Sequence, residues 1–303
     1  MAIAKDWDKA FLADRKGSAA TRDRAFRTWN PVVKFAKEKK WSLAPSTITP
    51  KQARIYLEHR ATVVSARCVQ LEASHLRRAI SGSGRELGDV RDPKNPWSSA
   101  RMGVPEGSRI GGKAAADPTR YESARHRMPD DIKAGVGLIN AIGLRMKESA
   151  MAKDSLEGWR GELAKPESRE RGVYLHIIDG CKGGRPRWVF VPPGRVDLVV
   201  AAVAAAAQSV SKCGNVIDAE NLKDALKRFS NCMSRLELTG DNSVHGLRRA
   251  FAQSQYAYYR EAGMSEALAL KRLSQDLGHG DGRGRWVANN YLLGGEGGSN
   301  GTD

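Results

Sequence analysis

Apolar residues in the first third of the chain recur every three or four positions, which is the spacing of a helix with one buried face. Between residues 21 and 40, this face consists of Phe26, Trp29, Val33 and Ala36. Thr49-Pro50 predicts the start of a second helix, because threonine caps a helix and proline fits its first turn. The same spacing predicts a third helix over residues 65–80. The first third of the chain is therefore predicted to be a small helical domain.

Turn-forming residues interrupt this pattern over residues 81–120. Asp92-Pro93 and Gly111-Gly112 are typical of loops, although a short helix is predicted around residues 97–102. The chain is therefore expected to consist of a helical domain at 1–110, a linker at 111–120, a second domain at 121–292 and a flexible, glycine-rich tail at 293–303.

Helical spacing returns from residue 129 onward, and one short β segment interrupts it. The apolar face of the next helix consists of Ile132, Val136, Ile139 and Leu144. Alternating apolar residues at 173–177, a glycine-rich turn and the apolar run 188–191 predict a β-hairpin. Further helices are predicted over 195–210, over 219–238 and from His245 onward. The predicted fold class is mainly α with a small β-hairpin, divided into two domains.

The chain is strongly basic, with a formal net charge of +16. Such a surface favours a polyanionic partner, and nucleic acid is the commonest one. Residues 1–120 contain 24 Lys and Arg against 12 Asp and Glu, so this part is predicted to be the main DNA-binding surface. Its candidate DNA contacts are Arg22, Arg24, Arg27, Lys34, Arg77 and Arg78. The alternative for this region is a solvated basic surface without a nucleic-acid partner.

The cysteines and the apolar segments predict neither a metal site nor a membrane span. The four cysteines are far apart in the sequence and form no C-x-x-C pair, which argues against a zinc site and a disulfide framework. The N-terminal segment carries charges where a signal peptide needs an apolar stretch, and no run of about 18 apolar residues is present. We therefore expect a reduced, cytoplasmic protein without a metal, a cofactor or a membrane anchor.

Four fragments in the second half of the chain carry the candidate chemistry. In order, they are Gly143-Leu144-Arg145, the glycine-rich turn around Lys182, the H-x-x-R pair His245 and Arg248, and Leu277-Gly278-His279 followed by Tyr291. Each fragment alone is common, and its residues have ordinary interpretations such as a surface arginine or a turn lysine. The rival tyrosines are Tyr256, Tyr258 and Tyr259. The ordered combination is what makes the signal specific.

Taken together, these fragments resemble the catalytic domain of the tyrosine recombinase/integrase family, from residue 120 to residue 292. The resemblance implies a helical core-binding domain followed by a mixed, mostly helical catalytic domain. It also implies a catalytic set that consists of Arg145, Lys182, His245, Arg248, His279 and Tyr291. Trp286 is an alternative to His279 in this set, and Arg185 and Arg187, close to Lys182, are further candidates for DNA contact.

These residue types suit the reaction of that family. Attack by a tyrosine on a phosphodiester places extra negative charge on the non-bridging oxygens, which Arg145 and Arg248 can bind through charge-assisted hydrogen bonds. The resemblance implies that His245 and His279 orient the phosphate and that Lys182 protonates the leaving 5′ oxygen. It also implies that Tyr291 becomes linked to the 3′ phosphate. This link keeps the bond energy, so neither a metal nor ATP is required.

The implied activity is that of a site-specific recombinase or integrase of a mobile element. It implies double-stranded DNA with short inverted sites as the partner, a synaptic tetramer, and a DNA-bending or directionality protein as an accessory factor. The expected location is the nucleoid of a prokaryotic or phage host. Two alternatives stay open: a type IB topoisomerase-like enzyme that relaxes DNA, and a catalytically inactive DNA-binding regulator with the same fold. The chain departs from the family pattern in having longer intervals before and after His279.

Overall fold

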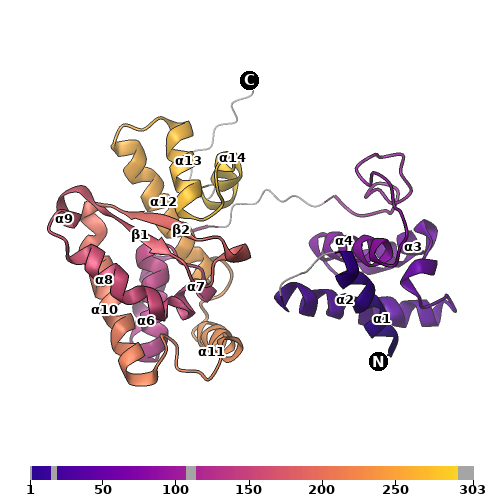
Figure 1. Ribbon diagram of the computed structural model, residues 1–303, viewed down its shortest axis with the longest axis horizontal. Coiled ribbons are helices and arrows are strands. Elements are labelled where there is room, and N and C mark those ends of the chain that lie inside the picture. The colour runs from indigo at the N-terminus through magenta and orange to yellow at the C-terminus, as the bar shows by residue number, and fades with distance from the viewer. Residues whose placement is uncertain (1, 15–18, 107–113, 293–303) are drawn as a thin grey trace. The chain divides into compact units, whose positions relative to one another are not determined.

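The computed structural model describes residues 2–14, 19–106 and 114–292, and it divides the chain into two compact units, Met1–Arg109 and Ile110–Asp303 (Figure 1). The described residues are mainly helical, with one two-stranded antiparallel sheet, which confirms the predicted fold class. The expected tail at 293–303 and residues 111–113 of the expected linker lie outside the described residues. The two units have separate hydrophobic cores.

The first unit is built from helices around an aromatic core. Its helices are α1 (Ala2–Asp14), α2 (Ala19–Glu38), α3 (Pro50–Ala61) and α4 (Ala66–Gly82), with a 3-10 turn η1 (Pro45–Thr47). The predicted start of α3 is confirmed. Thr49 Oγ1 accepts a hydrogen bond from the Gln52 backbone N–H at 3.2 Å, and Gln52 Oε1 accepts one from the Thr49 N–H at 2.9 Å. This reciprocal pair is a capping box.

Aromatic side chains fill the core of the first unit. The Trp29 ring lies 5.3 Å from that of Trp7 and 5.8 Å from that of Phe11, both on α1.

The predicted helix over residues 97–102 is wrong, because this segment forms turns that insert Trp97 into the core. The prediction that Phe26 belongs to the buried face is also wrong. The stripe of α2 that faces the core runs through Ala25, Trp29, Val32, Phe35 and Ala36, which leaves Phe26 exposed.

The second unit holds the remaining helices and the sheet. Its α-helices are α5 (Pro118–Arg125), α6 (Asp130–Ile142), α7 (Met146–Ala150), α8 (Leu156–Ala164), α9 (Ser168–Arg171), α10 (Val196–Cys213), α11 (Leu222–Arg235), α12 (Val244–Glu261), α13 (Glu266–Asp276) and α14 (Gly284–Val287). Its short 3-10 segments are η2 (Ala152–Ser155), η3 (Lys182–Gly184), η4 (Pro193–Arg195) and η5 (Gly240–Asn242), and one π-helical turn is η6 (Ala288–Leu292). The apolar helix α6 packs against both α10 and α12.

The predicted hairpin is confirmed as strands β1 (Val173–Ile177) and β2 (Arg187–Val191). They pair in an antiparallel register that places Leu175 opposite Val189, and both of these side chains are buried. α8 packs against β1 and α13 packs against β2. The turn between the strands therefore extends from a sheet that is anchored on the core.

The segment before α5 belongs to the second unit, which differs from the expected linker at 111–120. Ala116 is buried, and its N–H donates a hydrogen bond to the Gly246 carbonyl at 3.1 Å. Asp117 then caps α5 by accepting a hydrogen bond from the Thr119 N–H. Burial of Ala116 and capping of a helix explain why the chain is already folded at this point.

One helix also bears on the expectation that the chain has no membrane span. Among the described residues, the segment Pro193–Cys213 is long and apolar enough to cross a membrane by length and composition. A single helix of this kind is a weak indication, because the apolar core helices of soluble proteins share these properties. In this structure, Val199, Val203 and Ala206 of the segment are buried in the core of the second unit.

Candidate active site

The six predicted catalytic residues come from separate segments of the second unit. Arg145 precedes α7, Lys182 begins η3, His245 and Arg248 occupy the first turn of α12, His279 follows α13, and Tyr291 lies in η6. The structure brings Arg145, Arg248, His279 and Tyr291 together through hydrogen bonds that share partners. His245 is exposed beside Tyr291, with 5.7 Å between the ring centroids. Lys182 is exposed on the hairpin turn.

The Tyr291 hydroxyl group lies between an arginine and a histidine. Arg248 Nε donates a hydrogen bond to the hydroxyl oxygen at 3.4 Å, and His279 Nε2 is 3.3 Å from the same oxygen. The tyrosine side chain is buried, and the ring of Trp286 packs against both Tyr291 and His279. The hydroxyl group is therefore held among groups that can bind an anion and accept a proton.

Arg248 is a buried cation that is fixed by backbone carbonyls. Its side chain is 1% exposed. Its two terminal nitrogens donate hydrogen bonds to the carbonyls of Gly143 and Leu277. Burial lowers the pKa of this guanidinium to about 10, so Arg248 is still charged at neutral pH. These two carbonyls leave Nε directed at the tyrosine.

Arg145 is held by the turn between α6 and α7. Gly143 ends α6 with a left-handed backbone (φ +64°), and Arg145 then takes the cap position of α7. The Arg145 N–H donates to Glu148 Oε2 at 2.7 Å, and Arg145 Nη1 donates to Glu148 Oε1 at 2.6 Å. Arg145 Nη2 donates to the Leu277 carbonyl at 3.0 Å. The Leu277 carbonyl therefore accepts from both arginines of the candidate site.

Sequence reasoning missed Glu148, which is the buried anion at the centre of these cations. Burial alone would raise the pKa of this carboxyl, but hydrogen bonds and charge from Arg187, followed by the charges of Arg248 and Arg145, hold it at about 2. Glu148 is therefore ionised at neutral pH. A glutamate three positions after a cap residue is a capping-box signal, and the interval from Arg145 to Glu148 contains it.

The predicted DNA contact Arg187 is buried, and its terminal nitrogens face Glu148 in this structure. Its side chain is 5% exposed at the start of β2. Its Nη1 and Nη2 donate to the two carboxylate oxygens of Glu148 at 2.6 and 2.8 Å, and its Nε donates to the Asp276 carbonyl at 2.8 Å. These donors are therefore engaged inside the protein. Arg185, on the same turn, is exposed and stays a candidate for DNA contact.

The electrostatic balance of the site favours a bound anion. Burial, followed by the charge of Arg248 and other nearby cations, lowers the pKa of His279 to about 3, so its imidazole is neutral at pH 7. Lys182 is one of the cations that contribute to this shift. Burial also raises the pKa of Asp276 to about 6, so this carboxylate is mostly ionised at pH 7, and it and Glu148 face the charges of Arg145, Arg187, Arg248 and Lys182. Positive charge therefore exceeds negative charge around the Tyr291 hydroxyl group.

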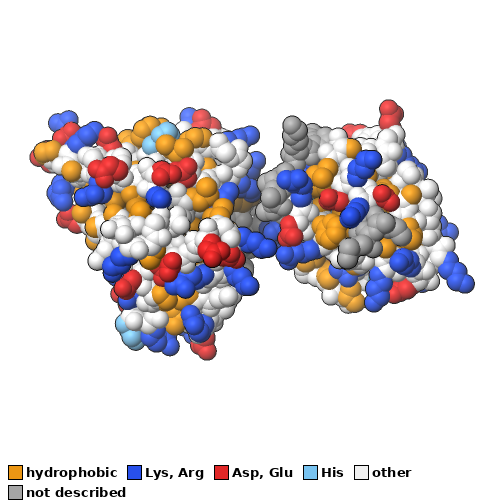
Figure 2. Space-filling model, turned by 60° about the horizontal axis from the view of Figure 1, so that its bottom comes forward, with side chains coloured by type: hydrophobic (Ala, Val, Ile, Leu, Met, Phe, Trp, Pro, Cys, Tyr) orange, Lys and Arg blue, Asp and Glu red, His pale blue; other side chains and the backbone are white. Residues whose placement is uncertain are grey.

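The predicted DNA contacts of the first unit fall into two groups. The exposed group, on α2, consists of Arg22, Arg24, Arg27 and Lys34. The other group is partly buried and has structural contacts. Arg77 donates to the Trp97 carbonyl at 2.7 Å, and the Arg78 guanidinium lies 4.0 Å from the centre of the Phe11 ring. Lys and Arg side chains are spread over the visible face of each unit in Figure 2. The α2 group is therefore the better candidate for phosphate contact.

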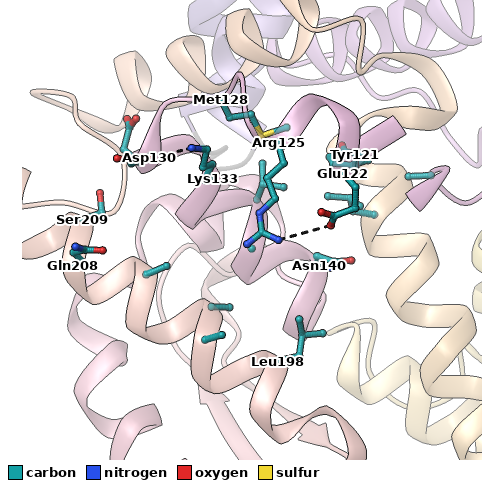
Figure 3. Close-up of a pocket in the computed structure, with 18 of the residues that line it drawn as sticks. Tyr121, Glu122, Arg125, Met128, Asp130, Lys133, Asn140, Leu198, Gln208 and Ser209 are labelled. Carbon is teal, nitrogen blue, oxygen red and sulfur yellow. Dashed lines mark hydrogen bonds and ion pairs between the residues drawn. The ribbon is translucent and has the colours of Figure 1, made fainter. Parts of the chain in front are cut away.

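A cavity lies elsewhere on the second unit, away from Tyr291. It is a cavity of about 510 Å³ between α5, α6 and α10, lined by side chains that include Tyr121, Met128 and Leu198 (Figure 3). None of the six predicted catalytic residues lines it.

Over the ranges 2–14, 19–106 and 114–292, no group of three or more His, Cys, Asp or Glu residues is arranged to hold a metal ion. The candidate chemistry is therefore concentrated around Tyr291.

Comparison with known protein families gives a match over half of the chain. A family model described as "Integrase" matches residues 103–254. This segment contains Arg145, Lys182, His245 and Arg248, whereas His279 and Tyr291 lie beyond it. A search of curated proteins found no match.

Several solved structures share the fold. A lambda integrase tetramer bound to a Holliday junction is 17% identical, with a TM-score of 0.55, and the match covers 92% of this chain and 76% of that chain. The Tn1549 transposon integrase in complex with transposon right end DNA is 14% identical, with a TM-score of 0.55 and coverages of 97% and 96%. The XerH site-specific recombinase bound to a palindromic difH substrate is 12% identical, with a TM-score of 0.51 and coverages of 86% and 73%.

Proposed function

The chain belongs to the integrase family of tyrosine recombinases, and we propose that it cuts and rejoins DNA at specific sites through a 3′-phosphotyrosyl intermediate. The observation that carries this proposal is the position of the Tyr291 hydroxyl group, 3.4 Å from Arg248 Nε and 3.3 Å from His279 Nε2. A nucleophile, a fixed cation and a proton acceptor thus meet at one point, where a phosphate can bind.

In the proposed first step, Tyr291 Oη attacks the phosphorus atom and the bond from phosphorus to the 5′ oxygen breaks. His279 accepts the phenolic proton, because a bound phosphate anion opposes the effects that lower the pKa of this imidazole in the free protein. Arg145 and Arg248 stabilise the charge that develops on the non-bridging oxygens. Lys182 donates its proton to the leaving 5′ oxygen. Attack by a 5′ hydroxyl group of another strand reverses these steps and releases Tyr291.

The proposal includes the partners and the setting of the reaction. The lambda integrase and XerH structures contain DNA, and the former is a tetramer on a Holliday junction. By analogy, this chain binds double-stranded DNA with short inverted sites and assembles into a synaptic tetramer. Its first unit serves as a basic core-binding domain, and a DNA-bending or directionality protein assists it. We place it on the nucleoid of a prokaryotic or phage host, where it integrates or excises a mobile element.

Trapping on nicked suicide DNA tests the proposal, since loss of the fragment beyond the nick prevents rejoining. With duplexes taken from the DNA that flanks the gene, the wild-type protein is expected to form a covalent adduct that resists denaturation. Tyr291→Phe removes the nucleophilic oxygen and is expected to form none. Tyr258→Phe is a matched control, because Tyr258 packs against Phe190 and Tyr259.

Each outcome separates the remaining alternatives. An adduct with Tyr291→Phe would show that another residue is the nucleophile. Binding without any adduct from the wild-type protein would favour the inactive regulator. Relaxation of supercoiled plasmid without site dependence would favour the topoisomerase-like enzyme.

A further inference from the structure

Arg187 is a buried cation of the site that does not reach the tyrosine. It lies at the start of β2, five positions after Lys182, and it donates hydrogen bonds to Glu148, to the backbone of Asp276 and to Cys181 Sγ. Its contact with Gly278 is close: a Cβ atom at Gly278 would lie 2.7 Å from Arg187 Cδ. The loop that carries His279 is therefore shaped to accept this side chain.

The Glu148 carboxylate accepts hydrogen bonds from the side chains of both Arg187 and Arg145. Arg187 binds both oxygens with its two terminal nitrogens, at 2.6 and 2.8 Å. The Arg145 side chain reaches only Oε1, at 2.6 Å. Arg248 Nη1 is 3.9 Å from Oε2, beyond hydrogen-bond distance. Arg187 thus takes the forked, two-point contact that an arginine and a carboxylate form most strongly.

We propose that Arg187 is a positioning residue that neutralises Glu148, so that Arg145 and Arg248 direct their charge to the phosphate. This inference rests on the proposed function, because it assigns a task to a residue that the phosphate does not touch. A glutamate without Arg187 would have Arg145 and Arg248 as its nearest cations. It would draw their guanidinium groups toward itself and weaken their hold on the phosphate. The carboxylate that orders Arg145 would then compete with the substrate.

Two other roles for Arg187 are less consistent with the geometry. Direct binding of the phosphate would require free N–H groups that face the tyrosine. The Arg187 side chain is only 5% exposed, and its two terminal nitrogens already donate hydrogen bonds to Glu148. A purely structural role would leave Glu148 as an unpaired buried charge and lower the stability of the fold, but it would not change how the site binds an anion. Neutralisation predicts that removal of the Glu148 charge restores both the anion binding and the reaction rate that the loss of Arg187 lowers.

A double-mutant cycle measures that repair. Arg187→Met, Glu148→Gln and the double variant are compared with the wild-type protein in the rate of adduct formation on suicide DNA. We expect Arg187→Met to slow the reaction by about 100-fold, as a small displacement of phosphate-binding groups does. The double variant should be at least about tenfold faster than Arg187→Met. A matched cycle uses Arg228→Met and Asp131→Asn, whose side chains form a forked pair at 3.0 and 3.2 Å.

A second measurement separates this proposal from the proposed function. Sodium sulfate raises Tm both by exclusion from the protein surface and by anion binding. The rise relative to sodium chloride at equal ionic strength is therefore compared between the wild-type protein and each variant, and the difference reports anion binding without DNA chemistry. Arg187→Met should reduce this rise and the double variant should restore it, whereas the Arg228 cycle should leave it unchanged.

Two results would overturn the role of Arg187. One is a double variant that is as slow as Arg187→Met, or slower, while the wild-type protein forms its adduct. The other is a rise in Tm with sulfate that Arg187→Met leaves intact. A wild-type protein that shows the sulfate pattern but forms no adduct would count against the proposed function alone.

Discussion

At the residue scale, Gly143 determines where Arg145 and Arg248 lie. Its backbone is left-handed, and a Cβ atom on it would lie 2.3 Å from the ring of Phe251. Its carbonyl accepts a hydrogen bond from Arg248, and the turn it makes places Arg145 at the cap of α7. Only glycine allows both this backbone conformation and this close approach.

Gly143→Ala is expected to lower the free energy of unfolding by about 2–5 kcal/mol, since it adds left-handed strain to overpacking against Phe251. Gly214→Ala is the matched control, because Gly214 also has a left-handed backbone (φ +77°) but a Cβ atom there meets nothing within 4 Å. It should cost about 1–2 kcal/mol. Urea unfolding curves give both values. Equal losses for the two variants would show that the Phe251 contact is unimportant.

At the element scale, the Asp276 side chain joins α13 to its neighbours. Its Oδ1 accepts from the Phe190 N–H of β2 at 3.2 Å. Its Oδ2 accepts from the hydroxyl group of Tyr259 at 2.6 Å and from Gln255 at 3.3 Å, both on α12. This network fixes the end of α13, and hence the carbonyls that hold the three arginines. One carboxyl group therefore supports the shape of the whole site.

Asp276→Asn is expected to change how stability depends on pH. Burial raises the pKa of Asp276 to about 6, so the folded protein holds this proton more tightly than the unfolded chain does. The resulting stability is present below the unfolded pKa of about 4 and is lost as the pH rises through about 6. The wild-type Tm should therefore fall relative to that of Asp276→Asn between pH 4 and pH 7, by the equivalent of about 3 kcal/mol. A Tm difference that does not vary with pH would contradict this assignment.

Elements with a local signal could be predicted from the sequence. The cap of Thr49 and the hairpin from Val173 to Val191 depend on neighbouring residues, and both predictions are confirmed. The roles of Glu148 and Arg187 could not be predicted, because their ion pair joins positions 39 residues apart. The hydrogen bond from Arg187 to Asp276 spans 89 residues. The sequence around Lys182 does not indicate that Arg187 is buried whereas Arg185 is exposed.

At the scale of the whole molecule, basic side chains are the best guide to DNA binding. The exposed cations on α2 have few described partners, apart from the pair between Arg27 and Asp23 at 2.9 Å. Neutralisation of phosphates by such side chains releases counterions, so affinity falls as salt rises. The net charge of +16 predicts a strong effect of this kind.

DNA affinity is expected to fall by about 10³-fold or more between 50 and 200 mM salt. Replacement of Arg22 and Arg24 by alanine should reduce the slope of log K against log salt by about 2, because two phosphate contacts are lost. Fluorescence anisotropy of a labelled duplex measures the slope. Arg160→Ala is the control, since Arg160 is an exposed arginine on α8 that pairs with Glu157. An unchanged slope in the double variant would remove α2 from the DNA-binding surface.

The excess of buried positive charge around Tyr291 leads us to expect that DNA changes how long a copy of the protein survives in a cell. A copy without DNA keeps the mutual repulsion of Arg145, Arg187 and Arg248, which Glu148 relieves only in part. A bound phosphate removes more of this repulsion and stabilises only the folded state. Copies on DNA would therefore unfold less often and meet proteases less often than free copies. Turnover would then adjust the amount of protein to the number of occupied sites.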